Sequence, residues 1–183
     1  MDATPPTSRR PEFGFFTEFS HPMVGRMGYP VFLAVRTSSI SELTSWIGSY
    51  HEAWKSAGHS GRGEVGVIVP VYVAETARRA REEPEASAMH FYRSIGHALA
   101  KSATTTMRTA TGHRLLDISY DEVLREFAVY GTPEAVADRL LDLREKLGYS
   151  TLSVWMNAGG QVPHERVLAS MRLFAERVMP RLG

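Results

Sequence analysis

The sequence predicts an α/β protein built from about four parallel strands with helices on the outside. Two apolar runs, residues 29–35 and 65–74, are bounded by turn residues, as buried parallel strands are. Apolar residues at helical spacing follow each run. The last third of the chain, residues 131–183, continues this order with a helix, a short strand at residues 151–157 and a closing helix.

Start and stop signals mark the helices of the last third. Thr132 can cap a helix with its hydroxyl, Pro133 supplies the fixed φ of a first helical residue, and Gly148 ends the helix. Pro163 opens the closing helix, and Pro180 is expected to stop it. Each helix has one predicted apolar face, formed by Val136, Leu140, Leu143 and Leu147 in the first and by Val167, Met171, Phe174 and Val178 in the second.

The first half of the chain is predicted in less detail. Residues 1–10 are polar and predict a disordered leader, and residues 11–183 predict a single domain. Residues 21–28 predict a connector with proline and two glycines. A helix is expected from Ile40 to Gly58. Pro70 predicts a bulge or an irregular centre in the strand at residues 65–74, because proline cannot donate to a ladder.

Between the second strand and Gly131 the pattern predicts helices separated by a loop. A charged helix beginning after Thr76 is expected to break or kink at Pro84, and a second helix covers residues 87–100. Residues 101–112 are rich in threonine and predict a loop. Ser119-x-x-Glu122 predicts a capping box that opens a helix over residues 121–130.

Composition excludes several classes of partner. The 21 Lys and Arg residues nearly balance the 20 Asp and Glu residues, so the net charge of +1 predicts no nucleic-acid partner and no anionic membrane surface. The chain contains no cysteine, which excludes thiolate metal sites and fits a reducing compartment such as the cytoplasm. No apolar run is long enough to span a bilayer. Neither a phosphate-binding glycine motif nor a metal-binding motif is present.

Specific motifs in the last third resemble the C-terminus of the bacterial luciferase-like, flavin-dependent monooxygenases. They are GTPE at residues 131–134, GGxxPHE at residues 159–165 and VMP at residues 178–180. Residues 50–84 look like the penultimate strand and helix of the same family, so the resemblance covers roughly residues 28–183. The aromatic run PEFGFFTEFS at residues 11–20 is similar to the family's first barrel strand; a hydrophobic docking arm is the alternative interpretation.

The resemblance implies a TIM-barrel-like fold that is incomplete. A (β/α)8 barrel takes about 250 residues, and 183 residues cannot hold eight units. The recognisable pieces correspond to the first strand and the last three, so residues 21–28 would be a taut, extended link without a crossover helix. A half-barrel of this kind would expose its concave face. We therefore expect a homodimer, or a complex with a fuller homologue, that covers this face.

The resemblance also implies an enzyme that uses reduced FMN and molecular oxygen on a small organic substrate, bound at the carboxyl ends of the strands. The cofactor-binding candidates there are Glu18, Phe19, Arg36, Thr37, Trp155 and Asn157, with Glu75 and Thr76 after the second strand. Arg36 could pair with a phosphate or carboxylate, Trp155 could stack on the isoalloxazine and Asn157 could hydrogen-bond its polar edge. Most of these residues have an ordinary structural role as the alternative. No catalytic residue and no metal ligand is identified.

Two further readings stay open. The family's phosphate grip lies mainly in the middle strands, which have no counterpart here, so FMN could be weakly bound or lost. The chain would then be a non-catalytic flavin-binding or protein-interaction module. A third interpretation is a gene remnant whose product folds poorly. His164, in the PHE turn, is read as a structural residue at a helix start rather than as a general base.

Overall fold

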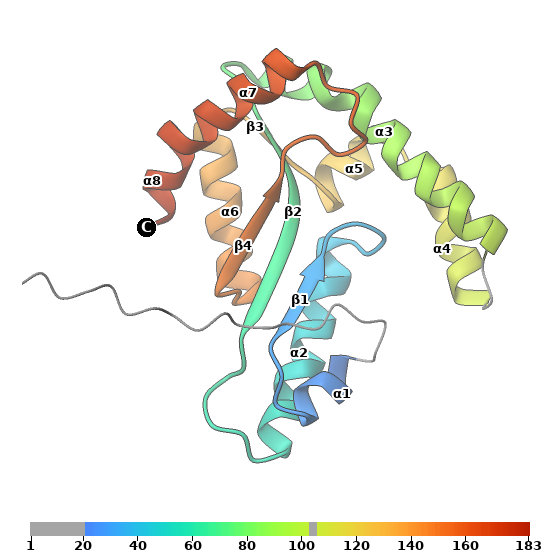
Figure 1. Ribbon diagram of the computed structural model, residues 1–183, viewed down its shortest axis with the longest axis vertical. Helices are drawn as coiled ribbons and strands as arrows, with labels where there is room; N and C mark the ends of the chain where they lie inside the picture. The colour runs from blue at the N-terminus through green and yellow to red at the C-terminus, as the bar shows by residue number, and fades with distance from the viewer. Residues whose placement is uncertain (1–20, 103–105) are drawn as a thin grey trace, which may run out of the picture.

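The computed structural model describes residues 21–102 and 106–183 of the chain. Its elements alternate between strands and helices, with two additional helices between β2 and β3 (Figure 1). In chain order they are α1 (His21–Arg26), β1 (Val31–Ala34), α2 (Ile40–Ser56), β2 (Val65–Val73), α3 (Ala77–Ser102), α4 (Thr106–Leu116), α5 (Tyr120–Glu126), β3 (Val129–Gly131), α6 (Pro133–Leu147), β4 (Thr151–Trp155), α7 (His164–Leu173), the π-helical segment η1 (Phe174–Val178) and α8 (Met179–Leu182).

The four strands form a parallel sheet centred on β2, which confirms the predicted fold class. Both β1 and β4 pair with the first half of β2: Val67 is the partner of Leu33 on one side and of Leu152 on the other. β3 pairs with the second half, over residues 71–73. Because β2 has neighbours along its whole length, nearly every residue in it is buried.

The two faces of this sheet are covered unequally. Paired residues of neighbouring strands point to the same face of the sheet, and successive residues of one strand point to opposite faces. Phe32, Ile68 and Ser153 therefore lie on one face, called the inner face, and their neighbours along each strand lie on the outer face. That opposite, outer face packs against α2 and α6, which lie behind the sheet in Figure 1. Its members Val31, Leu33, Val65, Val67 and Val69 are 0–6% exposed. On the inner face Phe32 and Ile68 are half-buried, and Thr151 and Ser153 are exposed.

Helix caps mark several junctions, and some of them were predicted. Ser39 and Glu42 form a complete capping box at the start of α2, which was not predicted. Thr132 accepts a hydrogen bond from the backbone N–H of Ala135, and Gly148 ends α6 with a positive φ of 62°. The Ser119 hydroxyl caps α5 through the N–H of Glu122.

Residues 21–28 are not an extended connector, because α1 forms within them. His21 stacks on Trp46 of α2 with ring centroids 4.5 Å apart. Gly25 lies so close to the backbone of Tyr50 that an added Cβ would collide with it. The missing side chain lets α1 approach α2, and the contact supplies the packing that the sequence pattern does not show.

The helices between β2 and β3 also correct the predictions. α3 continues through Pro84, which is buried, as one helix to Ser102. Residues 106–116 form α4, and its first part lies where a loop over residues 101–112 was expected. α3 and α4 pack through two glycines: a Cβ on Gly96 would lie 2.9 Å from the carbonyl oxygen of Gly112. This close approach stabilises a helix whose threonine-rich sequence has low intrinsic propensity.

A short strand replaces the end of the helix predicted over residues 121–130. α5 stops at Glu126, and β3 forms at Val129–Gly131 because β2 offers it a pairing edge. Pairing between β2 and β4 runs in register through Pro70, so no bulge interrupts it there. Pairing is interrupted on the other edge of β2. There β1 pairs with β2 as far as Ile68, and β3 begins to pair with it at Val71.

The closing helix differs from its prediction in two ways. It continues past Pro180 to Leu182, after one π-helical turn at η1. Its buried residues are Ser170, Phe174 and Val178, whereas Met171 is 48% exposed. Spacings of four residues rotate away from the 3.6-residue period, and the wider π turn keeps Phe174 and Val178 on the buried side. The strand predicted at residues 11–20 lies outside the described residues.

Candidate functional site

In a (β/α) fold, ligand-binding residues follow the carboxyl ends of the strands. Arg36, after β1, is exposed and has no ion-pair partner among the described residues. Thr37 is half-buried, and its carbonyl oxygen accepts a hydrogen bond from Arg114 at 3.0 Å. The remaining pair of candidates before β1, Glu18 and Phe19, lies outside the described residues. Among the described residues nothing pairs with the Arg36 guanidinium, which makes it a candidate for binding an anion.

Asn157, after β4, closes a loop at the same end of the sheet. Its side-chain oxygen accepts from the N–H of Val162 at 3.1 Å, and its amide nitrogen donates to the carbonyl of Val162 at 3.3 Å. The buried Ser87 of α3 holds the same loop, donating to Ala158 O at 2.6 Å and accepting from Gln161 N at 2.9 Å. The Asn157 amide therefore stabilises the loop that follows β4 at the carboxyl end of the sheet.

Trp155 is the last residue of β4 and points to the inner face, in register with Pro70. It is half-buried, and its ring meets Phe91 of α3 edge-on, with centroids 4.7 Å apart and planes at 86°. Phe91 also contacts Tyr92, which packs on Phe127. Phe91 therefore contacts the Trp155 ring on the inner face, and part of that ring stays accessible.

The loop after β2 is fixed to the closing helix by charge pairs. Arg177 of η1 contacts Glu75 at 3.0 Å and Glu134 of α6 at 2.8 Å. Thr76 caps α3, with its hydroxyl accepting from Arg79 N at 3.2 Å. All of these groups are exposed, so each pair contributes little stability on its own. They nevertheless account for Glu75 and Thr76 as structural residues.

A cavity of about 420 Å³, which no sequence pattern indicated, lies between the carboxyl end of β2, the start of α3 and α7. At one wall the buried Tyr72 hydroxyl donates to Glu83 at 2.6 Å, and Arg79 contacts the other carboxylate oxygen at 2.8 Å. Arg166 lies 4.0 Å from the same carboxylate. Ser170 borders the cavity and accepts the N–H of Val73 at 2.8 Å. A volume of this size suits a small organic ligand.

Protonation at this wall follows from burial and hydrogen bonding. Burial raises the pKa of Tyr72, and its hydrogen bond to Glu83 raises it further. For Glu83, burial alone would raise the pKa, but the hydrogen bonds from Tyr72 and Arg79 outweigh it and the pKa is lowered. Tyr72 is therefore a neutral donor and Glu83 a carboxylate over the physiological range.

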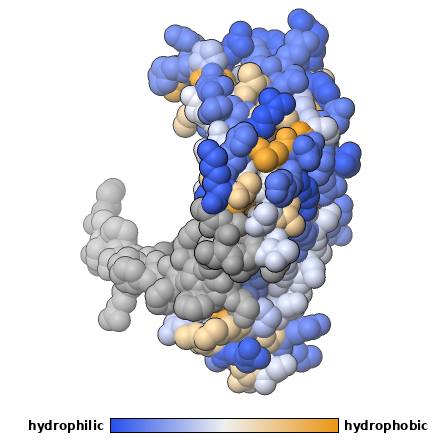
Figure 2. Space-filling model, turned by 90° about the vertical axis from the view of Figure 1, so that its right-hand side faces the viewer, coloured by the Kyte–Doolittle hydropathy of each residue, from blue (hydrophilic) through white to orange (hydrophobic). Residues whose placement is uncertain are grey.

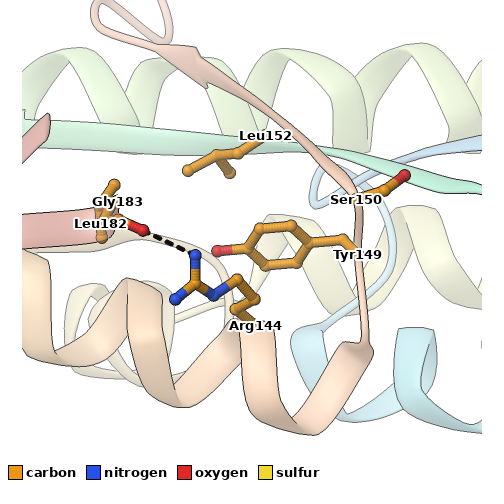
Figure 3. A pocket seen from close by; sticks show the side chains of 6 residues that line it. All are labelled: Arg144, Tyr149, Ser150, Leu152, Leu182 and Gly183. Atoms are coloured by element: carbon orange, nitrogen blue, oxygen red, sulfur yellow. Dashed lines mark hydrogen bonds between the residues drawn. The ribbon is translucent and has the colours of Figure 1, made fainter.

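A second cavity lies at the other end of the sheet (Figure 3). It measures about 140 Å³ and is bordered by Arg144, Tyr149 and Leu152, with Arg144 donating to the carbonyl of Leu182 at 2.7 Å. It sits beside the amino end of β4, where this fold keeps stabilising residues rather than reactive ones. His164 is exposed at the first turn of α7. Within residues 21–102 and 106–183 no group of three potential metal ligands gathers.

Comparison with known proteins defines the class. The family model described as luciferase-like monooxygenase matches residues 16–151, and the chain belongs to this family. No curated protein gave a significant match. Within the described residues no helix combines the length and apolar character that a membrane span requires.

Solved structures of this fold align with most of the chain. Monooxygenase RslO1 from Streptomyces bottropensis has 24% identity and a TM-score of 0.62, with 90% of this chain and 45% of that one covered. The oxygenating constituent of 3,6-diketocamphane monooxygenase from Pseudomonas putida, solved with FMN, has 20% identity and a TM-score of 0.61, with 90% and 46% covered. The coenzyme F420-dependent tetrahydromethanopterin reductase from Methanopyrus kandleri has 15% and 0.57, with 90% and 50% covered. The chain thus spans about half the length of these proteins, and the likeness concerns the fold.

Proposed function

We propose that the protein is a shortened luciferase-like monooxygenase that binds reduced FMN at the carboxyl ends of its strands and oxidises a small organic substrate with molecular oxygen. Membership of the family is the observation that carries this proposal. One neighbour of the same fold is a monooxygenase solved with FMN. The absence of cysteine supports a reducing compartment, and we place the protein in the cytoplasm.

The residues at the strand ends fit part of a flavin site. Arg36 has no ion-pair partner among the described residues, and its guanidinium group suits a phosphate; Thr37, the next residue, has a hydroxyl. The accessible part of the Trp155 ring offers an apolar surface to an isoalloxazine. Asn157 would act through the loop that it closes. Glu18 and Phe19 stay candidates from the sequence. When bound, reduced FMN would supply the electrons for oxygen activation; the protein's part is to orient it and exclude water.

Binding of FMN is expected to be weak in a single chain. The strand ends of the described residues offer one uncommitted arginine to the phosphate, where charge-assisted contacts contribute roughly 1.5–3 kcal/mol each. The absence of two such contacts would cost about two to four decades of affinity. Titration of the monomeric chain with FMN, followed by quenching of flavin fluorescence, should give a dissociation constant well above the nanomolar range. A nanomolar constant for a monomer would contradict the expectation.

A non-catalytic module that retains flavin binding is the second candidate, favoured by the engagement of Asn157 and of Trp155 in internal contacts. The two separate on one measurement: oxygen consumption by reduced FMN with and without the protein, beside the visible absorbance of flavin retained on it. Turnover supports the enzyme, and retained flavin without turnover supports the module. The absence of both turnover and binding in the FMN titration would contradict both candidates.

A variant pair assigns the effect to the site. Arg36→Ala should weaken FMN binding by roughly tenfold or more, since one charge-assisted contact is removed. Arg26→Ala is the matched control, because Arg26 is an exposed arginine at the end of α1, which precedes the amino end of β1. Equal loss of affinity in the two variants would show that Arg36 does not hold the phosphate.

A further inference from the structure

The cavity between the end of β2 and α7 has no part in the flavin site proposed above. Its volume of about 420 Å³ lies within the range of small-ligand pockets, roughly 300–1,000 Å³. β2 supplies one wall, the first turns of α3 supply a second, and α7 supplies the third. We propose that this cavity binds a small organic carboxylate, with its apolar body on the floor of the cavity and its carboxylate on the arginines at the rim.

The floor of the cavity is apolar and is formed by packed elements. Val73 and Ala74, at the end of β2, are 1% and 4% exposed. Ala169 and Leu173 complete the floor from α7. Between them Ser170 accepts the backbone N–H of Val73 at 2.8 Å, which holds α7 against the strand. The floor therefore exists before a ligand arrives, as it does in most small-molecule sites.

The rim of the cavity carries arginines that can bind a carboxylate. Arg79 donates its Nε to Glu83 at 2.8 Å, and Glu83 also accepts the buried Tyr72 hydroxyl at 2.6 Å. This carboxylate holds the Arg79 side chain through Nε, so the two terminal nitrogens of that side chain can donate to a ligand. Arg166 lies 4.0 Å from Glu83, and Arg172 has no ion-pair partner within the described part of the chain. Guanidinium groups of this kind bind carboxylates through paired hydrogen bonds.

The balance of charge around the cavity selects the class of anion. The lining contains three arginines and three glutamates. Glu75 is already paired with Arg177, which lies outside the lining. The three arginines then face two glutamates, Glu83 and Glu165, and one positive charge is in excess. A carboxylate with a single negative charge matches this excess, whereas a phosphate dianion would leave a negative charge beside both glutamates.

Charged side chains alone do not distinguish this cavity from the rest of the surface. Much of the face drawn in Figure 2 is hydrophilic, and exposed ion pairs such as Arg78–Glu82 occur elsewhere on α3. The cavity at the other end of the sheet measures about 140 Å³ and is lined by a single arginine, Arg144. The proposed site differs because several arginines stand over a concave apolar floor, so charge and apolar surface can act on one ligand.

The cavity continues the inner face beyond the candidate flavin site. Trp155 pairs with Pro70, and Tyr72 is the next residue of β2 on that face, roughly 7 Å closer to the carboxyl end. A carboxylate in the cavity would then lie one step beyond a flavin that contacts Trp155, and the substrate of the proposed reaction would be a small organic carboxylate. This last step rests on the proposed function, whereas binding to the cavity does not. Both experiments are therefore made without flavin, and binding without turnover would contradict the proposed function alone.

The first experiment is a titration of the isotope-labelled chain, followed by the NMR shifts of its backbone amides. Benzoate and hexanoate are each compared with the corresponding amide, which keeps the shape and lacks the charge. The carboxylates should bind at least tenfold more tightly than their amides, with the largest shifts at Ala74 and Ala169. Inorganic phosphate, at equal ionic strength, should bind more weakly than benzoate. Carboxylates that bind no more tightly than their amides, or phosphate that binds as tightly as benzoate, overturn the proposal.

The second experiment compares two pairs of variants at exposed positions, where the fold is expected to tolerate the change. Arg172→Gln should weaken benzoate binding about tenfold, and Arg78→Gln, an exposed arginine of α3 outside the lining, should leave it unchanged. Ala169→Trp fills the cavity and should abolish binding, whereas Ala175→Trp, on η1 and outside the lining, should not. Equal affinities within either pair overturn the proposal, and thermal melting of each variant confirms that it is folded.

Discussion

The side chains on the outer and inner faces of the same sheet differ in how deeply they are buried. On the outer face Val65, Val67 and Val69 are 0–1% exposed and pack in one core with α2 and α6. On the inner face Gly66 and Pro70 of β2 are buried, but Phe32 and Ile68 are half-buried and Thr151 and Ser153 are exposed. Burial of a large aliphatic side chain is worth about 1.5–3 kcal/mol. The outer layer therefore supplies most of the folding energy of one chain, and the inner layer is available for ligand and partner.

The largest expected effect tests the outer layer. Phe174→Ala should lower the free energy of unfolding by about 3–5 kcal/mol, because Phe174 is 8% exposed and its removal leaves a cavity. Met171→Ala, on the same closing helix, should change it by less than about 1 kcal/mol, since Met171 is 48% exposed. Urea denaturation measures both. Similar losses for the two variants would show that the buried side of this helix is assigned wrongly.

The next largest effect on stability is expected in the loop that follows β4. Gly159 has a φ of 90°, and a Cβ there would collide with the carbonyl of Ser87. Gly159→Ala should destabilise the chain by about 1–3 kcal/mol from backbone strain alone. Gly160→Ala shares the positive φ but meets no neighbouring atom, so it isolates the collision. Equal thermal stability of the two variants would exclude a role for the contact with α3.

A pair of serines compares a buried contact of the closing helix with the inner face. Ser170 is 1% exposed and accepts the N–H of Val73 beyond the end of β4, so Ser170→Ala leaves a buried donor without its partner. The expected loss is about 1–3 kcal/mol. Ser153→Ala, on the inner face, should cost less than about 0.5 kcal/mol in the same chemical denaturation. A loss at Ser153 as large as that at Ser170 would mean that the inner face carries structural hydrogen bonds of its own.

The sequence was informative where local signals and burial agree. The apolar run of β2 and the caps of α6 identify their elements because each is encoded within a few residues. β3 has three residues and exists only because β2 pairs with it, so no local pattern reveals it. α4 depends on the contact between Gly96 and Gly112, which are sixteen positions apart.

The candidate site shows the same limit. Strand ends could be located from the runs, which placed Arg36, Trp155 and Asn157 correctly at that edge of the sheet. Their partners could not be located, because Phe91 and Ser87 come from a helix whose position is set by tertiary packing. Glu83 lies within the charged run ARRAREEP, which is typical of a solvated helix face. Its contact with the buried Tyr72 depends on the way α3 leaves β2.

The smallest effect concerns pH and again separates the layers. Burial lowers the pKa of His21, and burial together with Arg62 lowers that of His51; both belong to helices on the outer side. The folded chain then binds these protons less readily than the unfolded chain, whose histidines titrate near about 6.5. Stability should therefore be full above that value and decline as the pH falls through it, because the unfolded state takes up more protons.

Urea midpoints compared on either side of about pH 6.5 measure the decline. His21→Gln should reduce it, since one titrating group is removed while a polar side chain remains beside Trp46. Midpoints that stay equal across this range would show that the outer layer accommodates charged histidines and is less tightly sealed than its burial indicates.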